Sequence, residues 1–157
     1  MSEVVEPCAD PGFLEFDFWL GEWELSWPAE QTGGESGDRS GGSNVIDRLF
    51  GTCVVRESFA TADDSYRGRS LSVYDLESGT WRQTWVDSSG GYLLFAGAWD
   101  GQTMELRTDE VIREDVPTIS RMVFRDIEAD SLAWDWQSSI DGGQSWSDVW
   151  TISYRRA

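Results

Sequence analysis

The stretch 139–146 reads Ser-Ile-Asp-Gly-Gly-Gln-Ser-Trp and has the spacing S-x-D-x-G-x-S/T-W. In such a stretch Asp and Gly supply a tight turn, and the aromatic residue restarts the strand. Residues 74–81 and 99–102 repeat this plan. The chain has 10 Trp in 157 residues, and most of them lie beside turns of this kind. The repeats predict an antiparallel meander with a large aromatic contact surface.

Alternation of apolar and polar residues predicts ten strands along the chain. Their connections are short and rich in Gly and Asp, which allows antiparallel pairing but no parallel crossover. Closing such a meander into a barrel removes its exposed edges. The predicted fold is all-β, a single antiparallel up-and-down β-barrel of about 8–10 strands. The predicted strands are 22–27, 43–50, 52–61, 67–75, 80–87, 91–99, 102–112, 117–128, 131–139 and 146–155.

Three other segments complete the predicted organisation. Residues 1–12 are predicted to be a flexible acidic arm, and 13–157 the barrel domain. The apolar segment 12–20 is too short for an independent helix and is predicted to form a helical turn that packs on the barrel. Residues 29–42 are Gly, Ser, Glu and Asp without a hydrophobic period, which predicts a flexible loop.

The two faces of strand 80–87 differ in a way that bears on function. Trp81, Gln83, Trp85 and Asp87 share one face, and Asp87 is also predicted to cap the following turn. A solid core would place Val, Ile or Leu there, whereas aromatic residues with a few polar groups are typical of a cavity wall. The alternatives are that Gln83 satisfies a buried neighbour or that this face is exposed. The predicted ligand-binding residues are Trp23, Asn44, Ser72, Tyr74, Gln83, Trp85, Arg121, Trp134 and Trp136.

The charge balance restricts the partners of the chain. It has 12 basic and 29 acidic residues, a net charge of −17, and no Lys. Nucleic acid and anionic membrane surfaces are therefore predicted not to be partners. Solubility, a salty environment or a compositional bias toward Arg also explains the acidity. The protein is expected to be a monomer or a homodimer.

The two cysteines and the N-terminal sequence predict a cytoplasmic location. A disulfide between Cys8 and Cys53 is geometrically feasible, but nothing in the sequence requires one. Two cysteines without a larger framework fit a reducing cytosol. Residues 1–6 are acidic and lack an apolar core, unlike a signal peptide. No run of 18 apolar residues occurs.

The absence of histidine removes the commonest catalytic base and the His-based triads and zinc sites. Any acid–base chemistry falls to a carboxylate or a phenol. Glu57 lies on an apolar face between Val55 and Phe59, where burial would raise its pKa. Glu57 and Tyr74 are thus the candidate catalytic residues if the protein is an enzyme. Alternatively, Glu57 pairs with an Arg such as Arg121. No cofactor or metal site is predicted.

Three stretches, 16–24, 74–87 and 139–146, together resemble a family of small, uncharacterised bacterial proteins that open with an FDFW-x-GxW segment. That family is similar to the calycin-like barrels, namely lipocalins, fatty-acid-binding proteins and nitrobindins. The resemblance covers about residues 13–156. It implies a closed or nearly closed barrel whose N-terminal segment plugs one end, and it implies no established activity. Nitrobindin-like barrels hold haem iron through a histidine, which this chain lacks. Residues 139–146 also match the Asp-box hairpin, which is interpreted as structural.

Three hypotheses on function follow. The first is intracellular binding of a small apolar or aromatic molecule in an aromatic-lined barrel cavity, oriented by Gln83, Asn44 and Arg121. The second is a cofactor-free cyclase or isomerase that uses the same cavity. The third is an interaction protein whose barrel is filled and whose partners bind its surface.

Overall fold

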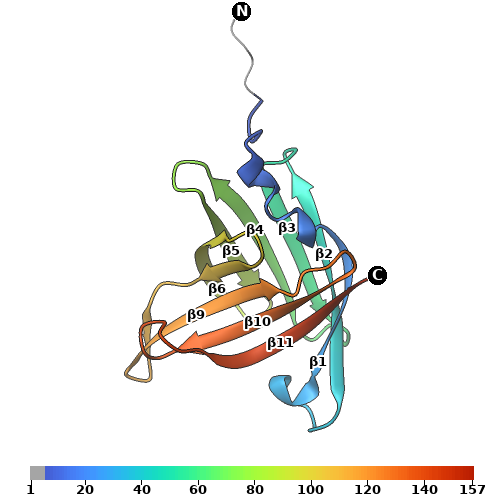
Figure 1. Ribbon diagram of the computed structural model, residues 1–157. Helices are drawn as coiled ribbons and strands as arrows, with labels where there is room; N and C mark the ends of the chain where they lie inside the picture. Colours follow the sequence, from blue (N-terminus) through green and yellow to red (C-terminus); the bar gives the residue numbers. More distant parts are fainter. Residues whose placement is uncertain (1–5) are drawn as a thin grey trace, which may run out of the picture.

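Ten antiparallel strands form a closed barrel in the computed structural model, which describes residues 6–157 (Figure 1). The first seven strands pair in chain order, and the barrel closes through the pairs β7–β9, β9–β10, β10–β11 and β11–β1. The predicted fold class is therefore confirmed. The barrel strands are β1 (Gly21–Pro28), β2 (Arg39–Leu49), β3 (Val54–Thr61), β4 (Arg67–Asp75), β5 (Thr80–Asp87), β6 (Tyr92–Trp99), β7 (Met104–Arg107), β9 (Val116–Arg125), β10 (Ser131–Ser139) and β11 (Ser147–Arg156).

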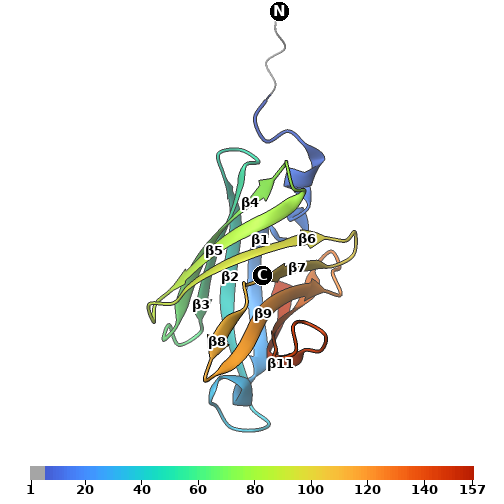
Figure 2. The same ribbon diagram turned by 90° about the vertical axis from the view of Figure 1, so that its left-hand side faces the viewer.

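The predicted strand 102–112 is wrong as a single element. It is split into β7 and the short strand β8 (Val111–Arg113). β7 pairs with both β6 and β9, whereas β8 pairs only with β9 and continues the hairpin beyond the barrel wall (Figure 2). The ladder with β6 ends at Arg107, and the strand is interrupted at 108–110, where Thr108 N–H still donates to the Ser120 carbonyl of β9.

The N-terminal segment closes one end of the barrel (Figure 1). It forms two 3-10 turns, η1 (Pro11–Leu14) and η2 (Asp17–Trp19), as the apolar segment predicts. Phe16 and Trp19 are buried; the Phe16 ring lies 4.8 Å from Trp81 and the Trp19 ring 4.9 Å from Phe124. These aromatic contacts hold the segment in the barrel end.

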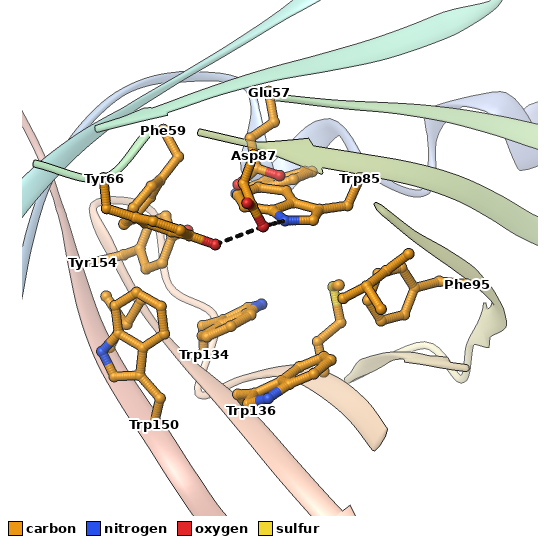
Figure 3. Close-up of a pocket in the computed structure, with 14 residues that line it drawn as sticks. Glu57, Phe59, Tyr66, Trp85, Asp87, Phe95, Trp134, Trp136, Trp150 and Tyr154 are labelled. Carbon is orange, nitrogen blue, oxygen red and sulfur yellow. Dashed lines mark hydrogen bonds between the residues drawn. The ribbon is translucent and has the colours of Figure 1, made fainter. Parts of the chain in front are cut away.

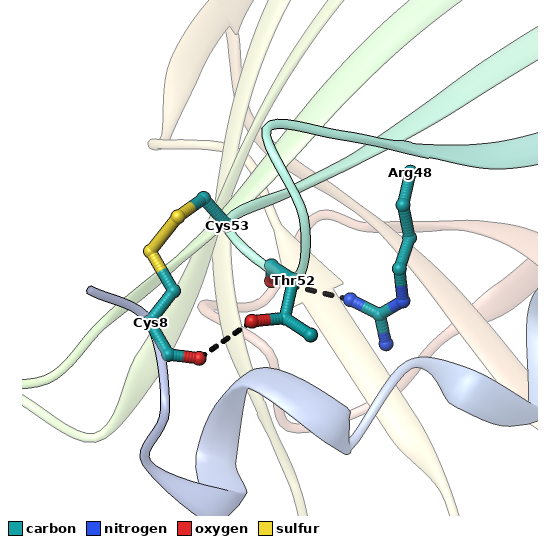
Figure 4. Close-up of a disulfide and its surroundings, with 4 residues drawn as sticks. All are labelled: Cys8, Arg48, Thr52 and Cys53. Carbon is teal, nitrogen blue, oxygen red and sulfur yellow. Dashed lines mark hydrogen bonds between the residues drawn. A yellow bond between two sulfur atoms is a disulfide. The ribbon is translucent and has the colours of Figure 1, made fainter. Parts of the chain in front are cut away.

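A disulfide joins Cys8 to Cys53, with the two Cα atoms 5.1 Å apart (Figure 4). Thr52 Oγ1 also donates a hydrogen bond of 2.7 Å to the Cys8 carbonyl oxygen. The sequence does not decide whether Cys8 and Cys53 pair, and the predicted cytoplasmic location rests partly on two cysteines that fit a reducing cytosol. Because the two cysteines are bonded, they no longer support that location. The predicted flexible arm 1–12 is too long, because the chain is attached to the barrel at Cys8. The first five residues of that arm lie outside the described residues.

The segment 29–42 is more ordered than predicted. It begins with η3 (Ala29–Thr32), and β2 already starts at Arg39 because Arg39 and the residues after it pair with β1. η3 lies at the end of the barrel opposite the N-terminal segment (Figure 1).

The interior of the barrel is unusual in having polar residues at its centre. On β4, Ser70 and Ser72 point inward and are buried, while Leu71 and Val73 are on the outer face and are 47% and 42% exposed. The inward face of β4 thus follows the period-two alternation, but hydrophobicity alone does not identify it. Within residues 6–157, no helix is long and apolar enough to cross a membrane, and no group of three or more acidic or cysteine side chains is placed to hold a metal ion.

Candidate functional site

A cavity of about 220 Å³ lies inside the barrel (Figure 3). The N-terminal segment that contains η1 and η2 is called the plug. Its Trp19 contributes to the lining, so the plug supplies one end of the cavity. A cavity of about 150 Å³ holds a benzene molecule, so this one has room for a compound of one ring or slightly more. Its aromatic lining residues are Trp19, Phe59, Tyr66, Trp85, Phe95, Trp134, Trp136, Trp150 and Tyr154.

Aromatic rings of β10, β11 and β3 fix one another in the cavity. Trp134 and Trp136 of β10 are parallel within 8°, with their centroids 6.3 Å apart. Trp150 of β11 meets Trp134 edge-on at 5.9 Å, and Phe59 of β3 meets Trp150 in the same way at 5.8 Å. Edge-to-face and offset contacts at these distances are the favoured arrangements of aromatic pairs. The lining is therefore preformed.

Trp85 depends on a glycine of the neighbouring strand. Gly68 lies beneath the indole, and a Cβ atom at that position would lie 2.0 Å from Cη2 of Trp85. The indole can therefore lie flat against the backbone of β4 only because residue 68 has no side chain.

Asp87 brings a carboxylate to the wall of this aromatic cavity (Figure 3). It accepts hydrogen bonds of 2.9 Å each from Tyr66 Oη and Trp85 Nε1, and it also caps the turn through the backbone N–H groups of Ser89 and Gly91. Burial opposes ionisation, but the hydrogen bonds outweigh it and hold the pKa of Asp87 well below its usual range. The predicted turn cap is confirmed, and the same side chain also belongs to the cavity.

Glu57 is the second acidic residue of the lining, and it is 8% exposed. Its two carboxyl oxygens accept hydrogen bonds of 2.7 Å from Asn44 Nδ2 and from Ser70 Oγ. Asn44 Nδ2 also donates to Tyr154 Oη at 2.9 Å. Burial raises the pKa of Glu57, against the opposing effect of these two hydrogen bonds. The alternative that Glu57 pairs with an arginine is wrong, because its partners are neutral.

The raised pKa makes stability depend on pH. The ordinary pKa of Glu is 4.5, and the folded protein binds the Glu57 proton more tightly than the unfolded chain does. The contribution of Glu57 to stability is thus fully present below pH 4.5 and is lost as the pH rises through the folded-state pKa. We expect Glu57→Gln to become more stable relative to the native protein across that range, by about 1.4 kcal/mol for each unit by which the pKa is raised. Urea unfolding from pH 4 to 8 checks this; a difference that does not vary with pH would contradict it.

The predicted site residues separate into three groups. Glu57, Trp85, Trp134 and Trp136 line the cavity. A second group is buried around the cavity without lining it, and there Gln83 Nε2 donates to Ser72 Oγ at 2.9 Å. Gln83 therefore satisfies a buried neighbour, which is one of the alternatives left open by the sequence. This second group is Trp23, Asn44, Ser72 and Gln83.

Tyr74 and Arg121, the third group, lie away from the cavity. Tyr74 packs against Phe13 of the plug at 5.3 Å, so it cannot act with Glu57. Arg121 is on the outer face of β9, with its guanidinium 4.0 Å from the centre of the Trp146 ring. Asp141 caps that hairpin, accepting a hydrogen bond of 2.9 Å from the Ser145 N–H. These contacts agree with a structural role for the Asp box and place Arg121 outside the barrel.

Sequence reasoning missed several lining residues. Asp87 shared a face with Trp85 but was assigned only to the turn. Tyr66 follows the same alternation backward from Ser70 through Gly68, although it precedes the predicted strand. Other missed lining residues are Trp19, Phe59, Leu93, Phe95, Met122, Trp150, Ile152 and Tyr154.

An outer groove adjoins the cavity. It has a volume of about 720 Å³ and shares Tyr66 and Trp150 with the cavity lining. The rest of it is formed by residues of β1, η3 and the chain that follows η3, β2, the end of β3 and the β3–β4 connection. Tyr66 and Trp150 thus stand between the groove and the barrel interior.

Comparison with known proteins gives one family. The model of a family described as "Protein of unknown function (DUF1579)" matches residues 16–156. Comparison with curated proteins gives no match. The family and the closed barrel agree with the predicted resemblance to an uncharacterised barrel family, whereas the likeness to calycins remains a prediction.

Proposed function

Because the chain belongs to the family of unknown function DUF1579, we propose a function from its cavity: the barrel binds one small apolar or aromatic molecule. The observation that carries this proposal is the unfilled volume of about 220 Å³ inside a closed barrel whose walls are mainly aromatic. Cavities of this kind bind small molecules through apolar contact, and a few polar groups orient them. Glu57 and Asp87 are the polar groups available here.

Leu93→Trp tests this proposal. Leu93 lines the cavity, so an indole at this position would take up part of its volume. Small one-ring compounds should quench tryptophan fluorescence saturably in the native protein, with dissociation constants in about the micromolar range. We expect the substitution to weaken binding about tenfold or more, measured by titration calorimetry.

The adjacent residue provides the control. Leu94 is 57% exposed, on the outer face of the same strand. Leu94→Trp adds the same side chain outside the barrel and should leave binding unchanged. Equal affinities in the two variants, or no saturable quenching by any compound, would refute the proposal.

A cofactor-free isomerase or cyclase is the second candidate function. It is supported by a buried carboxyl of raised pKa, Glu57, on the wall of an aromatic cavity. A carboxyl group whose pKa is raised by burial can serve as a general acid or base. In an enzyme, Glu57→Gln should abolish turnover while leaving ligand affinity nearly unchanged. The open cavity weighs against the third candidate, a filled barrel that acts only through its surface.

The remaining expectations concern partners and location. The net charge of −17 supports the proposal that nucleic acid and anionic membranes are not partners. A monomer or homodimer remains the proposed oligomeric state. The cytoplasmic location is retained as a proposal, and the Cys8–Cys53 disulfide is the observation against it. Alkylation of thiols in intact cells tests the location, since a cytoplasmic protein should yield two reduced cysteines.

A further inference from the structure

The ionisable side chains of the cavity are all acids. Glu57 and Asp87 are its acidic residues, and the described lining contains no arginine; the chain has neither Lys nor His. A neutral apolar ligand needs no charge in its site, and burying a charge without a partner is unfavourable. Asp87 has a structural role as a turn cap, but apolar binding alone does not account for a carboxylate on the cavity wall.

Among the described residues, neither carboxyl group has a counter-ion, but only Asp87 has hydrogen bonds that hold its pKa below the usual range. Its partners are a phenol, an indole, a hydroxyl and backbone N–H groups, all neutral. Within residues 6–157 it forms no ion pair, although acidic residues elsewhere, such as Asp135, pair with arginine. Its hydrogen bonds stabilise the carboxylate in place, so its negative charge persists inside the aromatic lining.

The position of Asp87 is fixed by the backbone. A Cβ atom on Gly91 would lie 2.2 Å from Asp87 Oδ2, so the turn can fold around the carboxylate only with glycine there. Figure 3 shows the carboxyl group directed into the cavity, between Tyr66 and Trp85 and opposite Trp134. The negative charge thus faces aromatic rings across the open volume.

Aromatic rings around an open volume attract cations through their negative faces. This attraction is about 0.5–2 kcal/mol for a cation over one ring, and it is the basis of the aromatic cages that bind quaternary ammonium groups. Tyr66, Trp85, Trp134 and Trp150 supply such rings around the Asp87 carboxylate. A carboxylate and aromatic faces together favour an organic cation over a neutral molecule of the same shape.

We propose that the ligand of this cavity is a small organic ammonium cation, held between the Asp87 carboxylate and the aromatic rings that surround it. This inference rests on the proposed small-molecule binding and specifies its ligand class. The volume of about 220 Å³ limits the ligand to about six to nine non-hydrogen atoms, by comparison with benzene in a cavity of about 150 Å³. The net charge of −17 also favours the approach of a cation from solution.

A matched pair of probes tests the ligand class. Choline and 3,3-dimethyl-1-butanol have nearly the same shape, but the first has a quaternary nitrogen where the second has a carbon. We expect choline to bind the native protein about ten- to thirtyfold more tightly, measured by titration calorimetry. Equal or tighter binding of the alcohol would overturn the proposal.

Asp87→Asn tests the role of the carboxylate. Asn keeps an oxygen for the Ser89 and Gly91 N–H groups, so the turn is preserved, whereas its Nδ2 replaces the oxygen that accepts from Tyr66 and Trp85. Circular dichroism verifies folding, and an unchanged affinity for the neutral alcohol verifies that the lining is intact. We expect this variant to lose most of the preference for choline. The control is Asp100→Asn, which removes the same charge from another turn cap, in the connection after β6. It should keep the full preference, and an equal loss in both variants would overturn the local role of Asp87.

The outcomes also separate this inference from the proposed function. If one-ring neutral compounds bind and choline does not, the cation proposal fails and small-molecule binding stands. If no compound binds saturably, both fail.

Discussion

Trp19→Ala is expected to lower the free energy of unfolding by about 3–5 kcal/mol, as for other fully buried Trp side chains. Trp19 is 1% exposed, and its ring packs 5.2 Å from Phe16 and 4.9 Å from Phe124. The substitution leaves a void in the plug that the surrounding rings cannot fill without moving. Because Trp19 also lines the cavity, the void should enlarge it, and two-ring compounds that the native protein excludes should then bind.

Denaturant unfolding and a titration with naphthalene-sized compounds check this result. The control is Trp99→Ala, since Trp99 is partly buried and stacks on Phe18 at 5.3 Å at the edge of the same cluster. It should destabilise less and leave ligand size selection unchanged. If Trp19→Ala lowers the free energy of unfolding no more than Trp99→Ala does, the plug does not contribute to the stability of the core as expected.

Reduction of the Cys8–Cys53 disulfide is expected to cause the second large effect. The two residues are separated by 45 positions. In the chain-entropy model a closed loop of that length stabilises the folded state by about 4 kcal/mol, because it restricts the unfolded chain. The barrel itself should remain folded, since the aromatic contacts of η2 do not depend on the disulfide.

Urea unfolding with and without dithiothreitol measures this contribution. The double variant Cys8→Ser, Cys53→Ser should match the reduced protein and should not respond to the reductant. An unchanged midpoint on reduction of the native protein, after mass spectrometry has verified two reduced thiols, would contradict the expected stabilisation.

The strand order and the inward faces could be predicted because both follow from local patterns. Turn signals such as that at 139–146 fix antiparallel neighbours, and period-two alternation assigns each side chain to a face. Alternation does not say how far along the barrel axis a residue lies. Trp81, Gln83 and Trp85 share a face, yet only Trp85 lines the cavity. Trp81 contacts the plug, and Gln83 donates a hydrogen bond to Ser72.

The placements of Arg121 and Tyr74 and the disulfide could not be predicted from local patterns. Arg121 was assigned to the site from its residue type, but it lies on the outward face of β9 against Trp146. Tyr74 occupies an inward position, but at the plugged end of the barrel, where Phe13 covers it. The disulfide depends on how the N-terminal segment returns to the β2–β3 connection, which no local pattern encodes.

The central claim is that the barrel is hollow and holds one small molecule, and a crystal soaked with bromobenzene tests it most directly. Bromine gives an anomalous signal that locates the compound independently of the protein density. We expect a single strong bromine peak inside the barrel, between Trp85, Trp134 and Trp150, with the surrounding strands unmoved. Side chains that fill this volume, or bromine peaks found only on the outer surface, would contradict it.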